Sequence, residues 1–332
     1  MNTAARESDP KCGHRIFLVG GTGTIGRATV RALVARGHKV VCFVRPAAKT
    51  DDVAAIRYGD VTDPGSLARD GFCGEPFDCV VSCLASRTGA PEDAWAVDYQ
   101  AHMNLLEAAK AAGVTHMVLL SAICVQKPLL AFQQAKLAFE RALMTSGMAY
   151  TIVRPTAFFK SLSGQVERVV GGKPWLLFGD GTLTACKPIS DDDLGTYIAD
   201  CVERADLRNR VLPIGGPGAA ITPRRQGEAL FALLGREPRF THVPVRMMDA
   251  IIGLLALLGR VFPPLKAKAE LARIGRYYAT ESMLVLDPAT GEYDADATPS
   301  TGSETLIDHY ARLVRGEAQA ELGDHAVFRR KA

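Results

Sequence analysis

The sequence lacks several features that would assign it to a specialised class of protein. Its 8 cysteines form no Cys-x-x-Cys pair and are dispersed along the chain, several of them inside apolar runs, which excludes a disulfide scaffold and an iron–sulfur cluster. The 39 Lys and Arg residues nearly balance the 36 Asp and Glu residues, so charge indicates no nucleic-acid partner. The N-terminal residues are polar, and no group of metal ligands is apparent. We therefore expect a globular protein of a reducing, cytosolic compartment.

One apolar run, residues 250–258 (AIIGLLALL), lies between Asp249 and Arg260. It is far shorter than the roughly 20 residues of a membrane-spanning helix, so we expect a buried or half-buried helix. The alternative is an apolar wall for a greasy ligand, or peripheral contact with a membrane surface.

The first half of the sequence alternates short apolar runs with helical stretches. The runs predict strands at residues 16–19, 40–44, 56–58, 78–83, 116–120 and 150–153. Continuous apolar strands separated by helices indicate an α/β fold, a Rossmann-type doubly wound parallel sheet. After Arg154, Gly and Pro become frequent, which predicts a smaller mixed α+β C-terminal lobe. We place the first domain at residues 14–155 and the lobe at 156–325, with the sheet free to recruit segments from the lobe.

The stretch GGTGTIG at residues 20–26 follows the first strand directly and opens a helix. Gly20 permits a tight turn, Gly23 lets the backbone approach a pyrophosphate, and Gly26 allows the helix to pack closely against the sheet. The N-terminus of the helix offers unpaired N–H groups to the anion. The stretch predicts a dinucleotide site, and the alternative is a structural glycine-rich turn. The other members of this predicted site are Thr22, Thr24 and Ile25.

The end of the second strand indicates which dinucleotide binds. An NAD-selective site usually has an acidic residue there, which bonds the ribose 2′-hydroxyl, but this sequence has Arg45. A guanidinium can bind a 2′-phosphate through two hydrogen bonds, which favours NADP(H). The alternative is that Arg45 is a solvated surface residue. Asp60 and Val61, after the third strand, are the expected contacts of the adenine.

Candidate catalytic residues follow the fifth strand. Ser121 ends that strand, and Lys136 lies on the next predicted helix. Short-chain dehydrogenases place a Ser there and a Tyr-x-x-x-Lys pair on the helix, but Phe132 occupies the Tyr position here. Because Phe cannot donate a proton, reduction of a carbonyl group by the usual acid is disfavoured. We predict catalytic roles for Ser121 and Lys136; the alternative for Lys136 is a solvated helix residue.

Reduction of an activated carbon–carbon double bond does not need that acid. Hydride added to the outer carbon of a vinyl group leaves a negative charge that a conjugated macrocycle can delocalise. The proton can follow from Lys136 or from a water that it orients. On this hypothesis, orientation of the nicotinamide against the substrate contributes more than any single acid.

Longer blocks of the sequence resemble the NADPH-dependent divinyl chlorophyllide 8-vinyl reductases, which are atypical short-chain dehydrogenases of chlorophyll and bacteriochlorophyll synthesis. The resemblance extends from about residue 15 to about residue 322, and Phe132 belongs to its pattern. The blocks are VVSCLASRTG (80–89), LLSAICVQKPLLAFQQAKLAFE (119–140), IVRPTAFFKSLSGQVE (152–167), FGDGTLTACKPIS (178–190), VLPIGGPG (211–218) and IGRYYATESMLVLDPATGEY (274–293).

The resemblance implies NADPH as cofactor and, as substrate, a Mg-tetrapyrrole whose 8-vinyl group becomes ethyl. The Mg²⁺ is then part of the substrate, and the first domain binds NADP(H) while the lobe binds the pigment. The residues implied to contact NADPH, besides the glycine stretch, Arg45, Asp60, Val61 and Lys136, are Leu84, Ala85, Pro155 and Thr156. The residues implied to face the substrate, each of which can equally be core packing, are Cys124, Gln126, Phe132, Phe158 and Phe159.

Two alternatives stay open at this point. One is another oxidoreductase of the same fold, isoflavone-reductase-like or quinone-reducing. The other is a non-catalytic NADP(H)-sensing or assembly module, which can keep the glycine stretch without the catalytic Tyr.

Plant members of the resembling family carry a chloroplast transit peptide, whereas about a dozen polar residues precede the first predicted strand here. We therefore expect an enzyme of a phototrophic bacterium, in the cytoplasm or at the periphery of its photosynthetic membrane.

Overall fold

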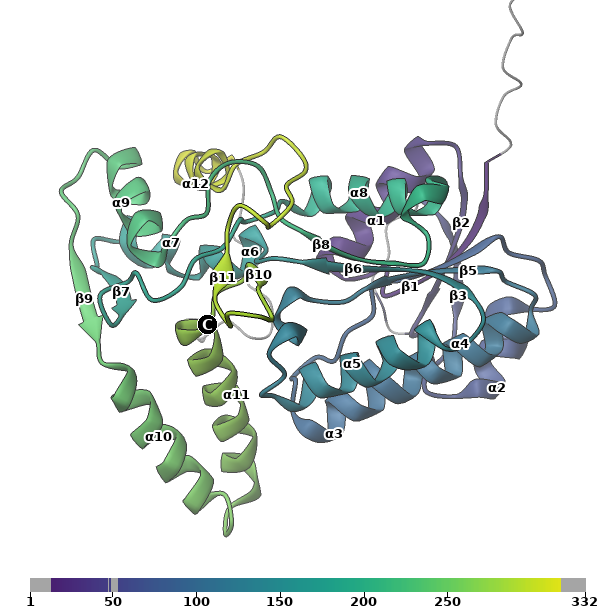
Figure 1. The fold of residues 1–332 in the computed structure, drawn as a ribbon, viewed down its shortest axis with the longest axis horizontal. Coiled ribbons are helices and arrows are strands. Elements are labelled where there is room, and N and C mark those ends of the chain that lie inside the picture. The colour runs from purple at the N-terminus through teal and green to yellow at the C-terminus, as the bar shows by residue number, and fades with distance from the viewer. Residues whose placement is uncertain (1–12, 47, 49–52, 318–332) are drawn as a thin grey trace, which may run out of the picture.

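A sheet of seven parallel strands forms the centre of the protein (Figure 1). The structure is a computed structural model, and it describes residues 13–46, 48 and 53–317. The strand order is β3-β2-β1-β4-β5-β6-β8, and every pairing is parallel. The strands are β1 (Arg15–Val19), β2 (Lys39–Val44), β3 (Ala55–Tyr58), β4 (Cys79–Ser82), β5 (His116–Leu120), β6 (Ala149–Pro155) and β8 (Arg210–Ile214).

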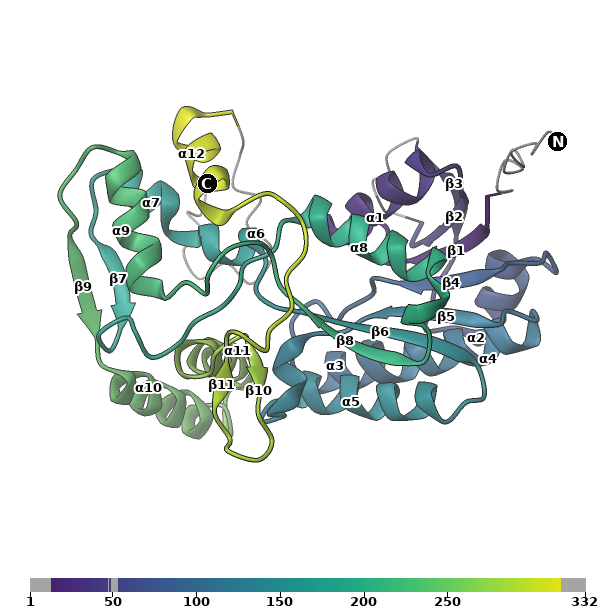
Figure 2. The same cartoon turned by 45° about the horizontal axis from the view of Figure 1, so that its top comes forward.

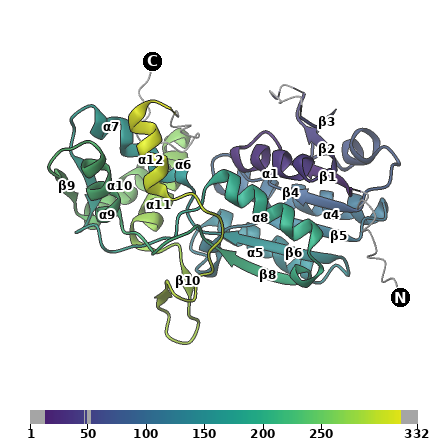
Figure 3. The same ribbon diagram turned by 90° about the horizontal axis from the view of Figure 1, so that it is seen from above.

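The strands are apolar on both faces because helices cover both sides of the sheet. In β1, Ile16 and Leu18 pack into one core cluster, whereas Phe17 and Val19 pack into the cluster of the opposite face. Helices α1 (Thr24–Ala35) and α8 (Asp191–Glu203) lie side by side on the first face (Figure 3). Helices α4 (His102–Ala111) and α5 (Ala131–Met144) cover the second face (Figure 1). This arrangement confirms the predicted doubly wound Rossmann-type fold.

The helical stretch that begins at Pro91 contains a π-helical segment. Helix α3 (Pro91–Ala94) continues into the π-helix η2 (Trp95–Ala101), which leads directly into α4. Smaller elements on this side are α2 (Pro64–Ser66) and the π-helix η1 (Leu67–Phe72). Segments of π-helix are uncommon overall but are found frequently at functional sites, so η2 is a candidate part of such a site.

A second lobe lies beside the sheet (Figure 2). Its core combines Trp175 and Leu177 with Phe231 and Tyr310, which come from one strand and two helices of this lobe. Strand β8 returns from this part of the sequence to the main sheet, so the division near residue 155 stays a prediction. Residues 318–325, the predicted end of the lobe, lie outside the described residues. Two short 3-10 helices, η3 (Ile123–Gln126) and η5 (Ala205–Leu207), belong to the connections of the main sheet. The remaining elements are α6 (Phe159–Leu162), η4 (Ser163–Gln165), α7 (Val166–Val170), β7 (Trp175–Phe178), α9 (Pro223–Leu233), β9 (Phe240–Val243), β10 (Val285–Leu286), β11 (Tyr293–Asp294) and α12 (Leu306–Arg315).

The apolar run at residues 250–258 forms most of α10 (Val245–Leu258), which pairs with α11 (Pro263–Thr280) in a projecting hairpin (Figure 1). The expectation of a buried or half-buried helix holds for one side only: Ile252 and Leu255 are half-buried, whereas no residue of α10 is fully buried and most of its apolar side chains are exposed. Within the described ranges, no helix has the length and hydropathy needed to cross a bilayer.

Two buried histidines stabilise the sheet in their neutral form. The Thr151 hydroxyl donates to the carbonyl of Leu207, so Nε2–H of His116 donates to Thr151 Oγ1 at 3.1 Å. His102 at the start of α4 lies 2.8 Å from the hydroxyl of Ser82 through Nε2. Burial lowers the pKa of each imidazole from 6.5 to about 4.

We expect the protein to lose stability as the pH falls below 6.5. Below this pH each histidine is protonated in the unfolded chain but stays neutral in the folded chain. The free energy of unfolding therefore falls by about 1.4 kcal/mol per pH unit for each histidine, until the pH reaches the pKa of the folded state. His116→Gln, which keeps a hydrogen-bond donor, should reduce the loss between pH 7 and pH 5 by about 2 kcal/mol. Urea unfolding at both pH values measures this difference. Parallel pH profiles for the two proteins would contradict a neutral His116.

Candidate active site

The glycine turn after β1 lies where the strand order changes direction, with β2 on one side of β1 and β4 on the other. Gly20 has a positive φ of 78°, and a Cβ there would lie 2.4 Å from the carbonyl carbon of Cys83. A Cβ on Gly26 would lie 2.1 Å from the carbonyl oxygen of Gly20. Both positions therefore require glycine. The sequence predicted that Gly26 allows close packing against the sheet. In the structure, the backbone that approaches Gly26 closely is that of the turn itself, at Gly20.

The first turn of α1 fits an anionic group. Its N-cap, Gly23, is exposed and makes no side-chain capping hydrogen bond, and the turn contains no acidic residue. The N–H groups of this turn are thus left for an outside acceptor, as in a site for a pyrophosphate. Ile25 is buried beneath the turn, and the carbonyl of Thr22 accepts a hydrogen bond from Arg27 at 2.9 Å.

A lysine that the sequence analysis missed lies at the same helix end. Nζ of Lys160 donates to Oγ1 of Thr24 at 2.8 Å, which joins the start of α6 to the start of α1. The two residues line a cleft of about 260 Å³ between the sheet domain and the second lobe. Because the contact is between residues 136 positions apart, no local pattern could have identified Lys160.

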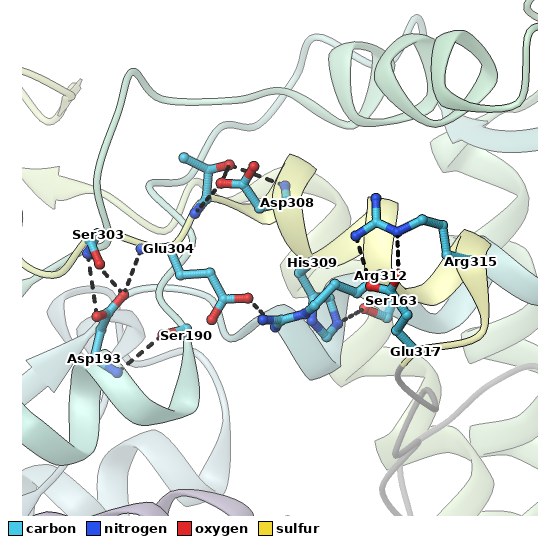
Figure 4. A network of polar contacts seen from close by, with 11 residues as sticks. Ser163, Ser190, Asp193, Ser303, Glu304, Asp308, His309, Arg312, Arg315 and Glu317 are labelled. Atoms are coloured by element: carbon cyan, nitrogen blue, oxygen red, sulfur yellow. Dashed lines mark hydrogen bonds and ion pairs between the residues drawn. The ribbon is translucent and has the colours of Figure 1, made fainter.

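Figure 4 shows the polar contacts that form the far wall of this cleft. The carboxylate of Asp193, on α8, accepts hydrogen bonds from the backbone N–H groups of Ser303 and Glu304. Arg312 of α12 pairs with Glu304, and Nε2 of His309 lies 3.2 Å from the hydroxyl of Ser163. These contacts tie the segment before α12 to α8 and close the cleft on one side.

The predicted adenine end of the site lies at the carboxyl ends of β2 and β3. Arg45 is exposed directly after β2, and Asp60 is exposed after β3. Hydrogen bonds from the backbone and hydroxyl of Thr62 lower the pKa of Asp60, and the charge of Arg45 acts in the same direction. Val61 is half-buried and packs on the core of the second face. The structure therefore brings Arg45 and Asp60 to one edge.

The other predicted cofactor contacts follow β4 and β6 at this edge of the sheet. Leu84 is half-buried beside Gly20, and Ala85 is exposed. Pro155 ends β6, and the N–H of Thr156 donates to the carbonyl of Ile214 at 2.9 Å. The Thr156 hydroxyl donates to the carbonyl of Lys187. The N–H and the O–H of Thr156 thus both donate to carbonyl groups of the chain itself.

Ser121 belongs to a buried polar cluster at the ends of β5 and β6. Its hydroxyl donates to the carboxylate of Glu140, which is fully buried and also pairs with the guanidinium of Arg154. The hydroxyl proton of Ser121 is therefore used in a hydrogen bond to the carboxylate of Glu140. This geometry gives Ser121 a part in holding β5, β6 and α5 together, and its predicted catalytic role stays a prediction.

Lys136 forms an ion pair that the sequence did not predict. Its Nζ lies 2.9 Å from Oδ1 of Asp98, and the two side chains are 11% and 0% exposed. Burial alone would raise the pKa of Asp98, but the charge of Lys136 and the N–H of Ser86 outweigh it and lower the pKa. Asp98 lies in the π-helical segment η2, and its Oδ2 is buried with no partner among the described residues. The pair fixes the direction of the Lys136 side chain.

The predicted substrate residues divide into two groups. Cys124 and Phe132 pack in one apolar cluster with Ile274 and Tyr277 of α11, and the Tyr277 hydroxyl donates to the carbonyl of Cys124 at 2.9 Å. Gln126 lies near them, but its side-chain amide is used within the chain. Its Nε2–H donates to the carbonyl of Leu284, and its Oε1 accepts from the N–H of Leu286, so Gln126 anchors this segment.

Phe158 is half-buried against the core of the first face. Phe159 is buried in the core of the second lobe, with its ring beside His309, and forms part of the cleft wall.

Comparisons with known proteins show which family and which relatives the chain resembles in sequence. Residues 20–205 match a family described as NAD(P)H-binding. The divinyl chlorophyllide a 8-vinyl-reductase of Oryza sativa subsp. indica is 52% identical over 331 residues, which cover 94% of this chain and 82% of that protein. The protein of the same name from Cucumis sativus is 52% identical, covering 97% and 81%. The photosystem II assembly factor Ycf39 of Synechocystis is 24% identical, covering 91% and 92%.

Solved structures show the same fold at lower identity. An NADPH-dependent quinone oxidoreductase from Escherichia coli, complexed with NADPH, superposes with a TM-score of 0.67 at 18% identity, covering 90% of this chain and 99% of that one. The enzyme WbmG of Bordetella bronchiseptica, in complex with NAD, gives a TM-score of 0.66 at 18% identity, covering 92% and 95%.

Lys136→Met should destabilise the protein by about 3–5 kcal/mol, because it leaves the carboxylate of Asp98 buried without its cation. The loss should shrink as the pH is lowered, since burial raises the pKa of the unpaired carboxyl and protonation then removes the buried charge. Chemical unfolding at pH 8 and pH 5.5, each relative to the unaltered protein, measures it.

The matched control is the double variant Lys136→Met with Asp98→Asn. A neutral amide at position 98 needs no cation, so this variant should recover most of the stability lost by Lys136→Met alone. Simple addition of the two single losses would show that the pair does not act as a unit.

Proposed function

This chain belongs to the divinyl chlorophyllide a 8-vinyl-reductase family, and on that premise we propose that it reduces the 8-vinyl group of a divinyl Mg-tetrapyrrole to ethyl. The substrate is 3,8-divinyl chlorophyllide a or protochlorophyllide a, and NADPH is the reductant. The observation that carries this proposal is the 52% identity to reductases of this name over 94% of the chain. The matching NAD(P)H-binding family supports the reductant.

The structure offers residues for each part of NADPH, which supplies a hydride when it is bound. We assign the pyrophosphate to the uncapped first turn of α1, with Lys160 as a nearby cation. Arg45 is assigned to the 2′-phosphate and Asp60 to the adenosine. Pro155 is assigned to the edge of the nicotinamide, at the carboxyl end of β6.

Lys136 is the residue assigned to the proton. Reduction of a vinyl group requires one hydride and one proton, and the ring system of the pigment delocalises the negative charge between the two additions. Phe132 contributes no proton, whereas the ammonium group of Lys136 is held in place by Asp98 and is 11% exposed. Lys136 donates its proton directly or orients a water, and solvent restores the proton afterwards. Asp98 acts through Lys136 and is a positioning residue.

The pigment needs a broad apolar surface. The apolar cluster of Cys124 and Phe132 with Ile274 of α11 lies on the same side of the sheet as α5 and Lys136, and we assign it to the substrate. Phe158 is assigned to the junction between this region and the sheet.

We also propose a reducing cytoplasmic location, at the periphery of a photosynthetic membrane of a phototrophic bacterium. In support, the described cysteines are free, and burial raises the pKa of Cys79 and Cys201 to about 12, which keeps them as inert thiols.

The alternatives have weaker support. The quinone oxidoreductase shares the fold at 18% identity, which says nothing of the substrate. The assembly factor, at 24% identity, is far more distant than the reductases.

Anaerobic incubation of the protein with NADPH and 3,8-divinyl chlorophyllide a should add two hydrogens to the pigment and shift its Soret band to shorter wavelength. Pigment mass and absorbance measure the product. The monovinyl pigment, whose 8-position is already ethyl, is the control and should not change. NADPH that binds without being oxidised would refute the reductase and favour a sensor or assembly protein.

Arg45→Asp should lower the preference for NADPH over NADH by roughly a hundredfold in kcat/KM, which corresponds to about one charge-assisted hydrogen bond. The new carboxylate would repel a 2′-phosphate and accept hydrogen bonds from a 2′-hydroxyl. Arg239→Asp, an exposed arginine on the second lobe, is the matched control and should leave the preference unchanged. An unaltered preference in Arg45→Asp would remove this residue from the 2′-phosphate site.

A further inference from the structure

The side of α10 that faces away from α11 is apolar and exposed. Met247, Ile251, Leu254 and Leu258 are spaced by 4, 3 and 4 residues, which places them on one face of the helix, and they are 40–57% exposed. We call these four residues the outer face. Met248, on the opposite side, lies against Gly275 of α11. Soluble proteins rarely expose a continuous apolar stripe of this kind without a partner for it.

The apolar surface continues onto the tip of the hairpin, between α10 and α11. Val261 and Phe262 are 73% and 57% exposed, which is unusual for large apolar residues in a turn. In Figure 1 this tip points away from the sheet and from α12. The outer face and the tip are therefore accessible together.

Basic residues flank this surface. Arg246, Arg260, Lys266 and Lys268 are exposed, and within the described part of the chain none of them forms a salt bridge. The two acidic residues of the region, Asp249 and Glu270, are paired with arginines of α11. The hairpin thus presents apolar side chains surrounded by uncompensated positive charge.

We propose that the α10–α11 hairpin docks on an anionic lipid bilayer, with the outer face and the tip among the acyl chains and the four basic residues at the headgroups. An interfacial helix combines an exposed apolar face with flanking Lys and Arg in this way. The surface lies along the plane of a bilayer and does not cross it, in agreement with the short apolar run.

Charge distinguishes the bilayer from other occupants. A second copy of the chain would bring its own uncompensated basic residues against these, which opposes association. A pigment is enclosed by a pocket, whereas the outer face and the tip project outward.

The hairpin also links the bilayer to the candidate substrate region. Tyr277 and Ile274, on α11, pack against Cys124 and Phe132. A pigment dissolved in the bilayer would thus enter beside α11; this last step rests on the proposed function, whereas bilayer binding does not.

Sedimentation of the full chain with vesicles tests the proposal without pigment or NADPH. The protein should bind vesicles of phosphatidylcholine with phosphatidylglycerol, bind weakly to phosphatidylcholine alone, and dissociate at high salt. The triple variant Ile251→Ser, Leu254→Ser and Phe262→Ser should lose binding. Arg260→Gln, Lys266→Gln and Lys268→Gln together should weaken it roughly a hundredfold, from about fivefold per charge.

Matched controls change exposed residues of the same kinds elsewhere. Val170→Ser, Leu233→Ser and Ile307→Ser together, or Lys39→Gln, Lys110→Gln and Lys173→Gln together, should leave vesicle binding unchanged. Circular dichroism confirms that each variant is folded.

Three outcomes would overturn the proposal. The unaltered protein fails to bind anionic vesicles, or the apolar variant binds them as well as the unaltered protein does. In the third, the unaltered protein is a dimer that the apolar variant dissociates while neither binds vesicles, which would assign the surface to a second copy. Because no substrate is present, failure here leaves the proposed reaction untouched, and failure of the reaction leaves this result untouched.

Discussion

A buried ion pair between Asp98 and Lys136 determines the geometry of the candidate active site. It joins the π-helical segment η2 to α5, and the N–H of Ser86 joins the loop after β4 to the same carboxylate. Either charge alone would be costly at this depth, so the three segments hold one another in a single arrangement. The neutral state of neighbouring His102 fits this picture, because burial and the charge of Lys136 both disfavour its protonation.

Much of the fold was predictable because its signals are local. Continuous apolar runs predicted six strands of the sheet but not β8, and the spacing of the glycines predicted the turn before α1. Lys136 was predictable from its distance to Ser121. By contrast, Asp98 lies 38 residues before Lys136 within an otherwise ordinary helical stretch, so no sequence period identifies their contact. The same reason applies to Lys160.

The sequence did not predict which side of α10 stays exposed, for a different physical reason. A helix that is apolar on all sides has no polar face from which its orientation can be deduced, and its burial depends on what the rest of the chain supplies to cover it. Here α11 covers only one side, so the opposite side stays exposed. Fold likeness has a similar limit, since the quinone oxidoreductase shares this scaffold at 18% identity and the scaffold does not determine the substrate.

The path of the chain between the two lobes has a consequence for biosynthesis. The chain leaves the sheet after β6, contributes β7 to the second lobe, returns for α8 and β8, and then leaves again for β9. During translation the edge strand of the sheet cannot be added until β8 has emerged from the ribosome, while β7 must wait longer still for β9. A fragment that ends near residue 155 therefore completes neither lobe: the sheet requires the chain through β8, and the second lobe requires it further, through β9.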